Sequence, residues 1–238
     1  MKDLNANNQA KQLAGIAAAR EVQSGWTVGL GTGSTAAFAI QELGRLVREQ
    51  QLRIECVATS FQARMLALDC GLSIVPTDAV SRLNISIDGA DEIDPELNLI
   101  KGGGAAHTRE KIVHAMSDRF IVVADPSKIV SRLGAKFAVP LEVLPDAIGL
   151  VTRILSDMQI GKMQLRTGSG KDGPTITDNG NVVLDVGLNP APSECAALED
   201  RLNQIPGVVE NGIFARYRPR PGDCIIGDPE APGGVRRL

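Results

Sequence analysis

The feature that most constrains this chain is the alternation of short apolar segments with amphipathic segments through its first half. The clearest apolar segment is Phe120–Ala124, FIVVA, a continuous run typical of a strand covered on both faces. Strands that alternate with helices form parallel sheets, because each helix carries the chain back to the same edge. We therefore predict an α/β fold in which helices cover both faces of a parallel sheet.

The later part of the chain has a different order of elements. Up to residue 124 we expect strands at Thr27–Leu30, Ile54–Ala58, Ile74–Val75, Asn84–Ile87, Leu97–Ile100 and Phe120–Ala124, and helices at Gln9–Val22, Ala36–Arg48, Gln62–Asp69 and Ala105–Met116. Beyond residue 137 we expect strand, helix, strand, strand, helix, strand, at Phe137–Leu144, Ala147–Met158, Met163–Arg166, Val182–Val186, Cys195–Ile205 and Val208–Phe214. This second order is that of a ferredoxin-like α+β unit.

Composition excludes several classes of partner. The chain has 25 Lys and Arg against 28 Asp and Glu, so we expect no basic surface for nucleic acid or membranes. Five Phe, one Trp and one Tyr are too few for a platform that stacks bases. The N-terminus lacks a secretory signal, and no apolar run is long enough to cross a membrane. We expect a cytoplasmic protein with reduced cysteines.

A glycine-rich loop, GLGTGST (29–35), follows the first strand and opens a helix. Glycine lets backbone N–H groups approach an anion, and the start of a helix adds positive potential. The loop is not a Walker loop, and Ser34 stands where a dinucleotide fingerprint needs its third glycine. An anion cradle and an ordinary strand-to-helix turn both remain open.

An acidic loop, DGADEID (88–94), follows the strand Asn84–Ile87 directly. Its four carboxylates belong to Asp88, Asp91, Glu92 and Asp94. The loop does not fit the EF-hand pattern. A solvated turn, or a site for hydroxyl recognition and proton transfer, both remain open.

A third loop, KGGG (101–104), precedes a helix that carries Glu110. Three consecutive glycines cost conformational entropy, which is explained most simply if the backbone approaches a ligand. His107, Glu110 and His114 share one face of that helix, but no zinc-binding motif is present. We therefore favour packing or solvent exposure for both histidines.

Lys128, in ADPSK (124–128), follows the buried strand Phe120–Ala124. The four loops follow four strands of a sheet expected to be parallel, so we expect them to converge on one edge. An anion cradle, two lysines, an acidic cluster and a helix carboxylate together suit a small phosphorylated polyol that undergoes proton transfer.

The same motifs carry a resemblance to a known family. GLGTGSTA (29–36), SIDGADEID (86–94), KGGGAA (101–106) with TREKI (108–112), and ADPSK (124–128) resemble the type A ribose-5-phosphate isomerases in order and spacing. The resemblance implies a Rossmann-like domain of residues 1–137 with 217–238, and an inserted ferredoxin-like domain of residues 138–216. It also implies a homodimer or homotetramer, with no metal and no cofactor.

The resemblance implies that ribose 5-phosphate and ribulose 5-phosphate interconvert through an enediolate, in the non-oxidative pentose phosphate pathway. Glu110 matches the catalytic base, Lys101 an oxyanion-stabilising group, and Asp88 a candidate for ring opening and hydroxyl proton relay. The matching substrate-binding positions are Thr32, Gly33, Ser34, Thr35, Asp88, Gly89, Ala90, Asp91, Lys101, Gly102, Gly103, Gly104 and Lys128.

Three segments depart from the family pattern, namely His107, ATSFQA (58–63) and the Pro/Arg-rich tail from Arg216. Two other functions share the broad fold. One is a sugar-phosphate deaminase or CoA transferase, and the other is a sugar-phosphate sensor that binds without turnover.

Overall fold

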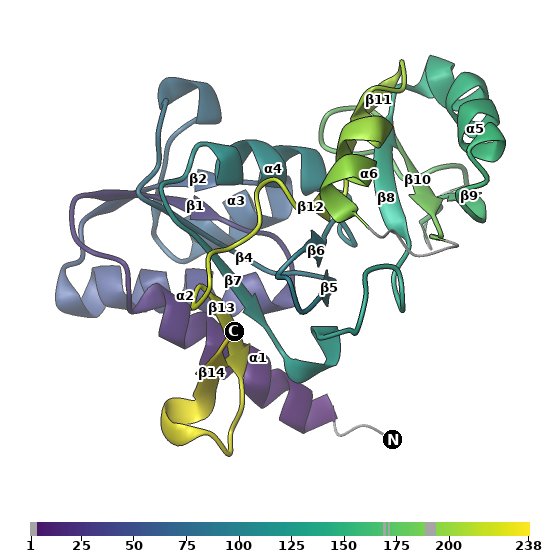
Figure 1. The fold of residues 1–238 in the computed structure, drawn as a ribbon. Coiled ribbons are helices and arrows are strands. Elements are labelled where there is room, and N and C mark those ends of the chain that lie inside the picture. Colours follow the sequence, from purple (N-terminus) through teal and green to yellow (C-terminus); the bar gives the residue numbers. More distant parts are fainter. Residues whose placement is uncertain (1–3, 169, 171, 189–193) are drawn as a thin grey trace. The chain divides into compact units, whose positions relative to one another are not determined.

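The computed structural model describes residues 4–168, 170, 172–188 and 194–238 (Figure 1). The chain forms two compact units. The first consists of Met1–Ala90, Arg109–Lys128 and Pro219–Leu238, and the second of Asp91–Thr108 and Ile129–Arg218.

The first unit contains a seven-stranded sheet in the order β14-β13-β7-β4-β1-β2-β3. Its strands are β1 (Trp26–Leu30), β2 (Ile54–Ala58), β3 (Ser73–Ile74), β4 (Ile85–Asp88), β7 (Phe120–Ala124), β13 (Cys224–Gly227) and β14 (Val235–Arg237). All neighbours are parallel except β13 and β14. The strand order reverses between β1 and β4, which makes that point the topological switch where α/β sheets bind ligands. The predicted parallel sheet is confirmed; β14 was not predicted.

Four helices belong to this sheet: α1 (Leu4–Ala19), α2 (Ser34–Gln50), α3 (Phe61–Asp69) and α4 (His107–Ala115). Successive side chains of a strand point to opposite faces, so β2 contributes to two cores. Cys56 packs in the cluster that contains residues of α1, α2 and α3, whereas Val57 packs with Val113 of α4. Helices therefore cover both faces, as predicted.

The second unit contains a four-stranded antiparallel sheet in the order β11-β8-β10-β9. Its elements are β8 (Val139–Val143), α5 (Ile148–Asp157), β9 (Met163–Leu165), β10 (Val182–Val186), α6 (Cys195–Asn203) and β11 (Val208–Asn211). Val139, Leu141 and Val143 pack with Val151 and Leu155 in one buried cluster. The order of elements is the predicted ferredoxin-like one.

A separate three-stranded sheet corrects two predictions. It consists of β5 (Glu92–Ile93), β6 (Leu99–Ile100) and β12 (Ile213–Phe214), all antiparallel. Leu97–Ile100 was predicted in the parallel sheet, and Val208–Phe214 as one strand; both predictions are wrong. The chain leaves the four-stranded sheet at Gly212, where a Cβ would lie 2.3 Å from the carbonyl oxygen of Lys101.

The compact units divide the chain at other places than the predicted domains. Residues 91–108, 129–137 and 217–218 were expected in the first domain, whereas the division into compact units groups them with the second unit. The reason for the first segment is β6, which pairs with β12 of the second unit. The described residues also form four short 3₁₀ helices: η1 (Thr77–Ala79), η2 (Pro126–Lys128), η3 (Pro145–Ala147) and η4 (Pro232–Gly234).

All four cysteines are free, and burial raises the pKa of the Cys56 and Cys224 thiols to about 12.

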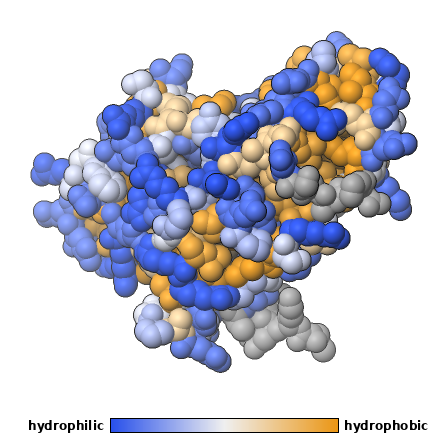
Figure 2. All heavy atoms as spheres, viewed as in Figure 1, coloured by the Kyte–Doolittle hydropathy of each residue, from blue (hydrophilic) through white to orange (hydrophobic). Residues whose placement is uncertain are grey.

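In the described part of the chain, no helix has the length and apolar character needed to cross a membrane. Figure 2 shows hydrophobic residues at the surface of the second unit around α5, and the exposed large ones of that unit include Leu144, Leu150 and Leu165.

Candidate active site

Two loops meet at the topological switch of the parallel sheet. The backbone N–H of Thr32, after β1, donates to Oδ1 of Asp88 at the end of β4 over 3.0 Å. The N–H of Gly89 donates to the same oxygen over 2.7 Å. A Cβ on Gly31 would lie 2.1 Å from that oxygen, so only glycine permits this approach. The glycine-rich loop and the acidic loop thus form one local structure.

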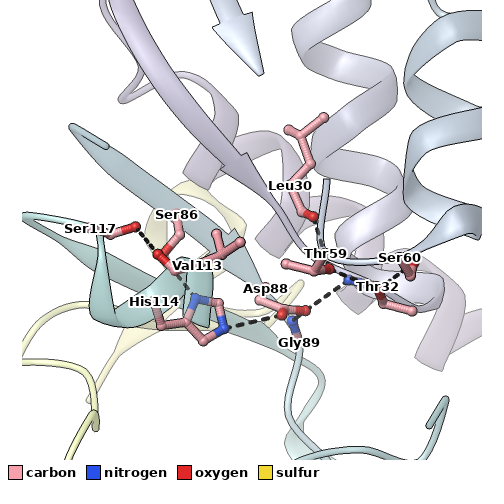
Figure 3. A network of polar contacts seen from close by, with 10 residues as sticks. All are labelled: Leu30, Thr32, Thr59, Ser60, Ser86, Asp88, Gly89, Val113, His114 and Ser117. Atoms are coloured by element: carbon pink, nitrogen blue, oxygen red, sulfur yellow. Dashed lines mark hydrogen bonds and ion pairs between the residues drawn. The ribbon is translucent and has the colours of Figure 1, made fainter. Parts of the chain in front are cut away.

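The hydroxyl of Thr32 lies in a cluster of hydroxyl groups (Figure 3). Its Oγ1 is 2.9 Å from Oγ1 of Thr59 and 2.7 Å from Oγ of Ser60. Thr59 donates to the carbonyl oxygen of Leu30 over 3.0 Å, and Ser60 accepts from the N–H of Ala63 at the start of α3. Neither Thr59 nor Ser60 was predicted as a site residue, although the sequence places these two adjacent hydroxyl residues at the end of a strand.

The first turn of α2 presents the remaining predicted residues of this loop. Gly33 precedes the helix with φ 100°, a left-handed conformation that favours glycine, and its N–H donates to Oε1 of Gln62 over 3.2 Å. Ser34 is exposed and Thr35 is buried. The first N–H groups of a helix lack intrahelical acceptors, so this turn can receive an anion.

Two further predicted residues belong to the first unit. Glu110 lies in the first turn of α4 and is 4% exposed. Lys128 is the last residue of η2, which follows β7, and its N–H donates to the carbonyl oxygen of Asp125. Because β7, β4 and β1 are parallel neighbours, Lys128, Asp88 and Thr32 all follow strands that end at one edge of the sheet.

The second unit holds Asp91 and the KGGG loop. The N–H of Gly103 donates to Oδ2 of Asp91 over 2.7 Å, and the N–H of Asp91 donates to the carbonyl oxygen of Ile100. The Lys101 side chain is 2% exposed, and its Nζ lies 5.5 Å from the ring centroid of Phe214. The loop is therefore tied to the acidic residue that sequence resemblance assigned to the same site.

Arg166, which was not predicted as a site residue, directly follows β9 and supports this loop. Its Nη1 donates to the carbonyl oxygens of Gly102 and Gly103 over 2.8 and 3.1 Å. Its Nε and Nη2 donate to the two carboxylate oxygens of Asp185 over 2.8 and 2.5 Å. A planar fork with five donors can hold both partners at once. No local sequence signal marked this arginine.

The other two carboxylates of the acidic loop have structural partners. Glu92 accepts backbone N–H groups of Gly134, Lys136 and Phe137. Asp94 accepts the N–H groups of Glu96 and Asn98 and the Asn98 side-chain amide. These two acids hold loops together, so two of the four carboxylates of the acidic loop have a structural role.

The two histidines of α4 are both buried, which agrees with packing. Nε2 of His107 lies 3.3 Å from the carbonyl oxygen of Glu210. His114 contacts Ser86 and Asp88, and this connection was not predicted. Among the residues that the structure describes, no three His, Cys, Asp or Glu are grouped so that they could hold a metal ion.

The predicted residues thus fall into two local groups. Thr32–Thr35, Asp88–Ala90, Glu110 and Lys128 belong to the first unit. Asp91 and Lys101–Gly104 belong to the second. Chemically, the first group offers an anion cradle, an oriented carboxylate and a buried carboxylate on a helix. The second offers an amine and a glycine loop held by an acid and an arginine.

Comparison with known proteins gives a consistent result. The family model for ribose 5-phosphate isomerase A (phosphoriboisomerase A) matches residues 55–230. Ribose-5-phosphate isomerase A of Thermosynechococcus vestitus is 52% identical over 229 residues, which cover 95% of this chain and 96% of the relative. The enzyme of Methanothermobacter thermautotrophicus is 50% identical over 205 residues, 86% of this chain and 89% of the relative.

Solved structures agree with these sequences. Ribose 5-phosphate isomerase A of Methanocaldococcus jannaschii is 44% identical, with a TM-score of 0.88 over 96% of this chain and 97% of that one. A D-ribose-5-phosphate isomerase in complex with phospho-erythronic acid is 42% identical, with a TM-score of 0.90 over 96% of each chain.

Proposed function

The chain belongs to the ribose 5-phosphate isomerase A family, and on this premise we propose how its residues interconvert ribose 5-phosphate and ribulose 5-phosphate. In the open-chain aldose, C1 is an aldehyde and C2 carries a hydroxyl group. Isomerisation moves a hydrogen from C2 to C1 and a hydroxyl proton from O2 to O1. An enediolate stands between the two sugars.

Glu110 is the proposed base that removes the proton from C2 and returns it to C1. A carboxylate in this role typically contributes about 10²–10⁴-fold to the rate. The proposal is supported by the near-complete burial of Glu110 in the first turn of α4, because a base shielded from water keeps its proton for return to the substrate.

Lys101 and the backbone N–H groups of Gly102–Gly104 are proposed to stabilise the negative charge that develops on the sugar oxygen. One such donor typically stabilises the transition state by about 2.7–4 kcal/mol. Support comes from the buried Lys101 side chain and from the hydrogen bonds that hold Gly102 and Gly103 in place.

Asp88 is proposed to open the furanose ring and to relay hydroxyl protons, while Gly89, Ala90 and Asp91 contact the sugar. The observation that carries this assignment is the carboxylate of Asp88, whose Oδ1 is held by the N–H groups of Thr32 and Gly89 at the switch of the sheet. An oriented acceptor at this point suits a hydroxyl group of the substrate.

The phosphate is proposed to bind Lys128 and the loop Thr32–Thr35. The start of α2 supplies N–H groups and the loop supplies hydroxyl groups, and both are preferred partners of phosphate. A sugar phosphate recognised in this way needs no aromatic stacking surface, which agrees with the scarcity of aromatic residues.

We further propose that the reaction needs no metal and no cofactor, and that the protein acts in the cytoplasm as part of the non-oxidative pentose phosphate pathway. A homodimer or homotetramer is proposed from the family resemblance and from the large apolar side chains that the second unit exposes. Light scattering of the purified protein, whose subunit mass is 25.2 kDa, measures the assembly directly.

The function is tested by mixing purified protein with ribose 5-phosphate, with and without EDTA, and following ribulose 5-phosphate. We expect the same turnover in both samples. Loss of turnover with EDTA would exclude a cofactor-free reaction, and turnover of amino sugars alone would indicate a deaminase.

The base is tested with Glu110→Gln, which should lower kcat by about 10³-fold while substrate binding persists. Glu230→Gln, at an exposed position, is the matched control and should retain the wild-type rate. A near-wild-type rate for Glu110→Gln would exclude Glu110 from the role of base.

A further inference from the structure

The second oxygen of the Asp88 carboxylate faces a histidine that the proposed reaction does not yet use. Nε2 of His114, on α4, lies 3.2 Å from Oδ2 of Asp88, and Nδ1 of the same ring lies 3.0 Å from Oγ of Ser86 (Figure 3). All three residues belong to the first unit, and Asp88 and Ser86 are on β4. The imidazole thus connects helix α4 to the carboxylate at the switch of the sheet.

The chemistry of the partners favours one tautomer of the ring. When Asp88 is ionised, its carboxylate can only accept hydrogen bonds, so Nε2 carries the proton and donates a hydrogen bond to Oδ2. In a neutral imidazole Nδ1 is then an acceptor, so the hydroxyl of Ser86 donates to Nδ1. The chain of donors runs from Ser86 through His114 to Asp88.

The surroundings hold this ring in one orientation. His114 is 4% exposed, and its ring stacks on Phe120 of β7 with 3.8 Å between centroids and 16° between planes. Ser86 is completely buried inside β4. Ser, His and Asp form the catalytic triad of many hydrolases, but a serine that no substrate can reach does not act as a nucleophile. The arrangement therefore suits orientation of Asp88.

Both oxygens of Asp88 are then held from different directions. Oδ1 accepts the N–H groups of Thr32 and Gly89, and Oδ2 accepts from His114. We propose that His114 is a positioning residue that orients the Asp88 carboxylate for proton exchange with the hydroxyl groups of the sugar. This inference rests on the proposed function, because it requires Asp88 to act on the substrate.

The helix that carries His114 gives the inference a second consequence. His114 lies four residues after Glu110, so both side chains project from the same face of α4. One rigid helix therefore carries the proposed base and the group that orients the proposed proton relay. A displacement of about 1 Å in such a group can cost about 10²-fold in rate.

The inference is tested by kinetics of His114→Leu and His114→Gln. Leucine removes the donor but keeps an apolar side chain against Phe120, and we expect kcat to fall about 10–100-fold while KM changes less than about 3-fold. Glutamine carries an amide N–H that can reach Oδ2, and we expect it to restore most of kcat. Ser117→Ala, which removes a 2.7 Å hydrogen bond to the carbonyl oxygen of Val113 on the same helix, is the control and should keep the wild-type kcat.

A spectroscopic measurement separates positioning from a merely structural role. The chain contains two histidines, so the ring nitrogens of ¹⁵N-histidine-labelled protein give two sets of signals, and His114→Gln assigns them. We expect His114 to be neutral with its proton on Nε2, and Asp88→Asn to shift its signals more than those of His107. A ring whose proton is on Nδ1, or one that does not respond to Asp88→Asn, would overturn the inference.

The outcomes distinguish this inference from the function on which it rests. A wild-type protein without isomerase activity would overturn the function, and a fully active Asp88→Asn would remove Asp88 from the reaction; either result also overturns the positioning role. If the wild type is active and Asp88→Asn is not, an unchanged kcat for His114→Leu overturns the inference alone. The inference is also overturned if both His114 variants lose kcat only in proportion to their loss of melting temperature.

Discussion

The backbone N–H of Thr32 and the carboxylate of Asp88 are joined by a 3.0 Å hydrogen bond across 56 positions of sequence. This bond links the loop after β1 to the end of β4, and it forms because Gly31 has no side chain. Two motifs that are separate in the sequence therefore depend on each other. A change in one loop should alter the orientation of the carboxylate in the other.

Gly31→Ala should disturb this connection directly. The new Cβ would lie 2.1 Å from Oδ1 of Asp88 and 2.5 Å from its Cα, so the carboxylate or the loop must move. We expect kcat/KM for ribose 5-phosphate to fall by about 10²-fold or more, because small displacements at a reacting group are costly. Steady-state kinetics measure this effect. Gly149→Ala, where a Cβ has no heavy atom within 4 Å, is the control, and equal kinetics of the two variants would contradict the prediction.

Lys128→Ala should raise KM more than it lowers kcat. The proposed partner of Lys128 is the phosphate, which does not take part in the proton transfer, so its loss weakens the ground state and the transition state alike. Loss of a hydrogen bond to a charged group corresponds to about 1.5–3 kcal/mol, or about 10–100-fold in KM. Lys128→Arg keeps the charge and should retain most of the affinity. An unchanged KM in Lys128→Ala would place the phosphate elsewhere.

Arg166→Lys should weaken the reaction although it preserves the charge. The guanidinium of Arg166 holds the carbonyl oxygens of Gly102 and Gly103 while it forms a bidentate pair with Asp185. A lysine has one ammonium group and cannot keep these contacts together. We expect kcat/KM to fall about 10-fold, and Asp185→Asn to show part of the same loss. Wild-type kinetics of Arg166→Lys would show that the KGGG loop keeps its conformation without the hydrogen bonds of the guanidinium group.

The parallel sheet was predictable because its signals are local. A continuous apolar strand such as Phe120–Ala124, and a glycine-rich turn between a strand and a helix, indicate their structure without knowledge of distant partners. The sheet of β5, β6 and β12 was not predictable. Its strands have two residues each, and Ile213 pairs with Ile100 from a distant part of the chain. Such pairing depends on the fold of everything between the two residues.

The same distinction applies to the candidate site. Asp88, Lys101 and Glu110 stand in motifs that the sequence displays, and their roles remain predictions. His114 and Arg166 contact residues on other strands or loops, so these contacts depend on the register of the fold. The only signal for His114 was its position one turn after Glu110, and that spacing alone also suits a packed side chain.

A buried carboxylate in the second unit gives the last prediction. Glu142 of β8 is completely buried, and the side chains of four residues donate to it, namely Thr108, Thr177, Asn179 and Asn181. Burial raises the pKa of Glu142, but the four sets of hydrogen bonds outweigh burial, so its pKa lies below the ordinary value of 4.5. The folded state therefore prefers the ionised carboxylate more strongly than the unfolded chain does.

The sign of the pH dependence follows from this preference. Because the pKa is lower in the folded state, the stabilisation is complete above about pH 4.5 and is lost as the pH falls through the folded-state pKa. Glu142→Gln should lower the free energy of unfolding at pH 7 by about 2–3 kcal/mol. The glutamine side chain has an NH₂ group, which would face the donor groups of the surrounding side chains and leave some of them without an acceptor. Below about pH 4.5 the free energies of unfolding of the variant and the wild type should converge.

Urea unfolding between pH 3 and pH 8 measures this convergence. Glu49→Gln removes an exposed ion pair with Arg45 on α2 and should change the free energy of unfolding by no more than about 1 kcal/mol. A difference between wild type and Glu142→Gln that stays constant over the whole pH range would show that Glu142 contributes through packing alone. A difference that grows as the pH falls would reverse the inferred direction of its pKa.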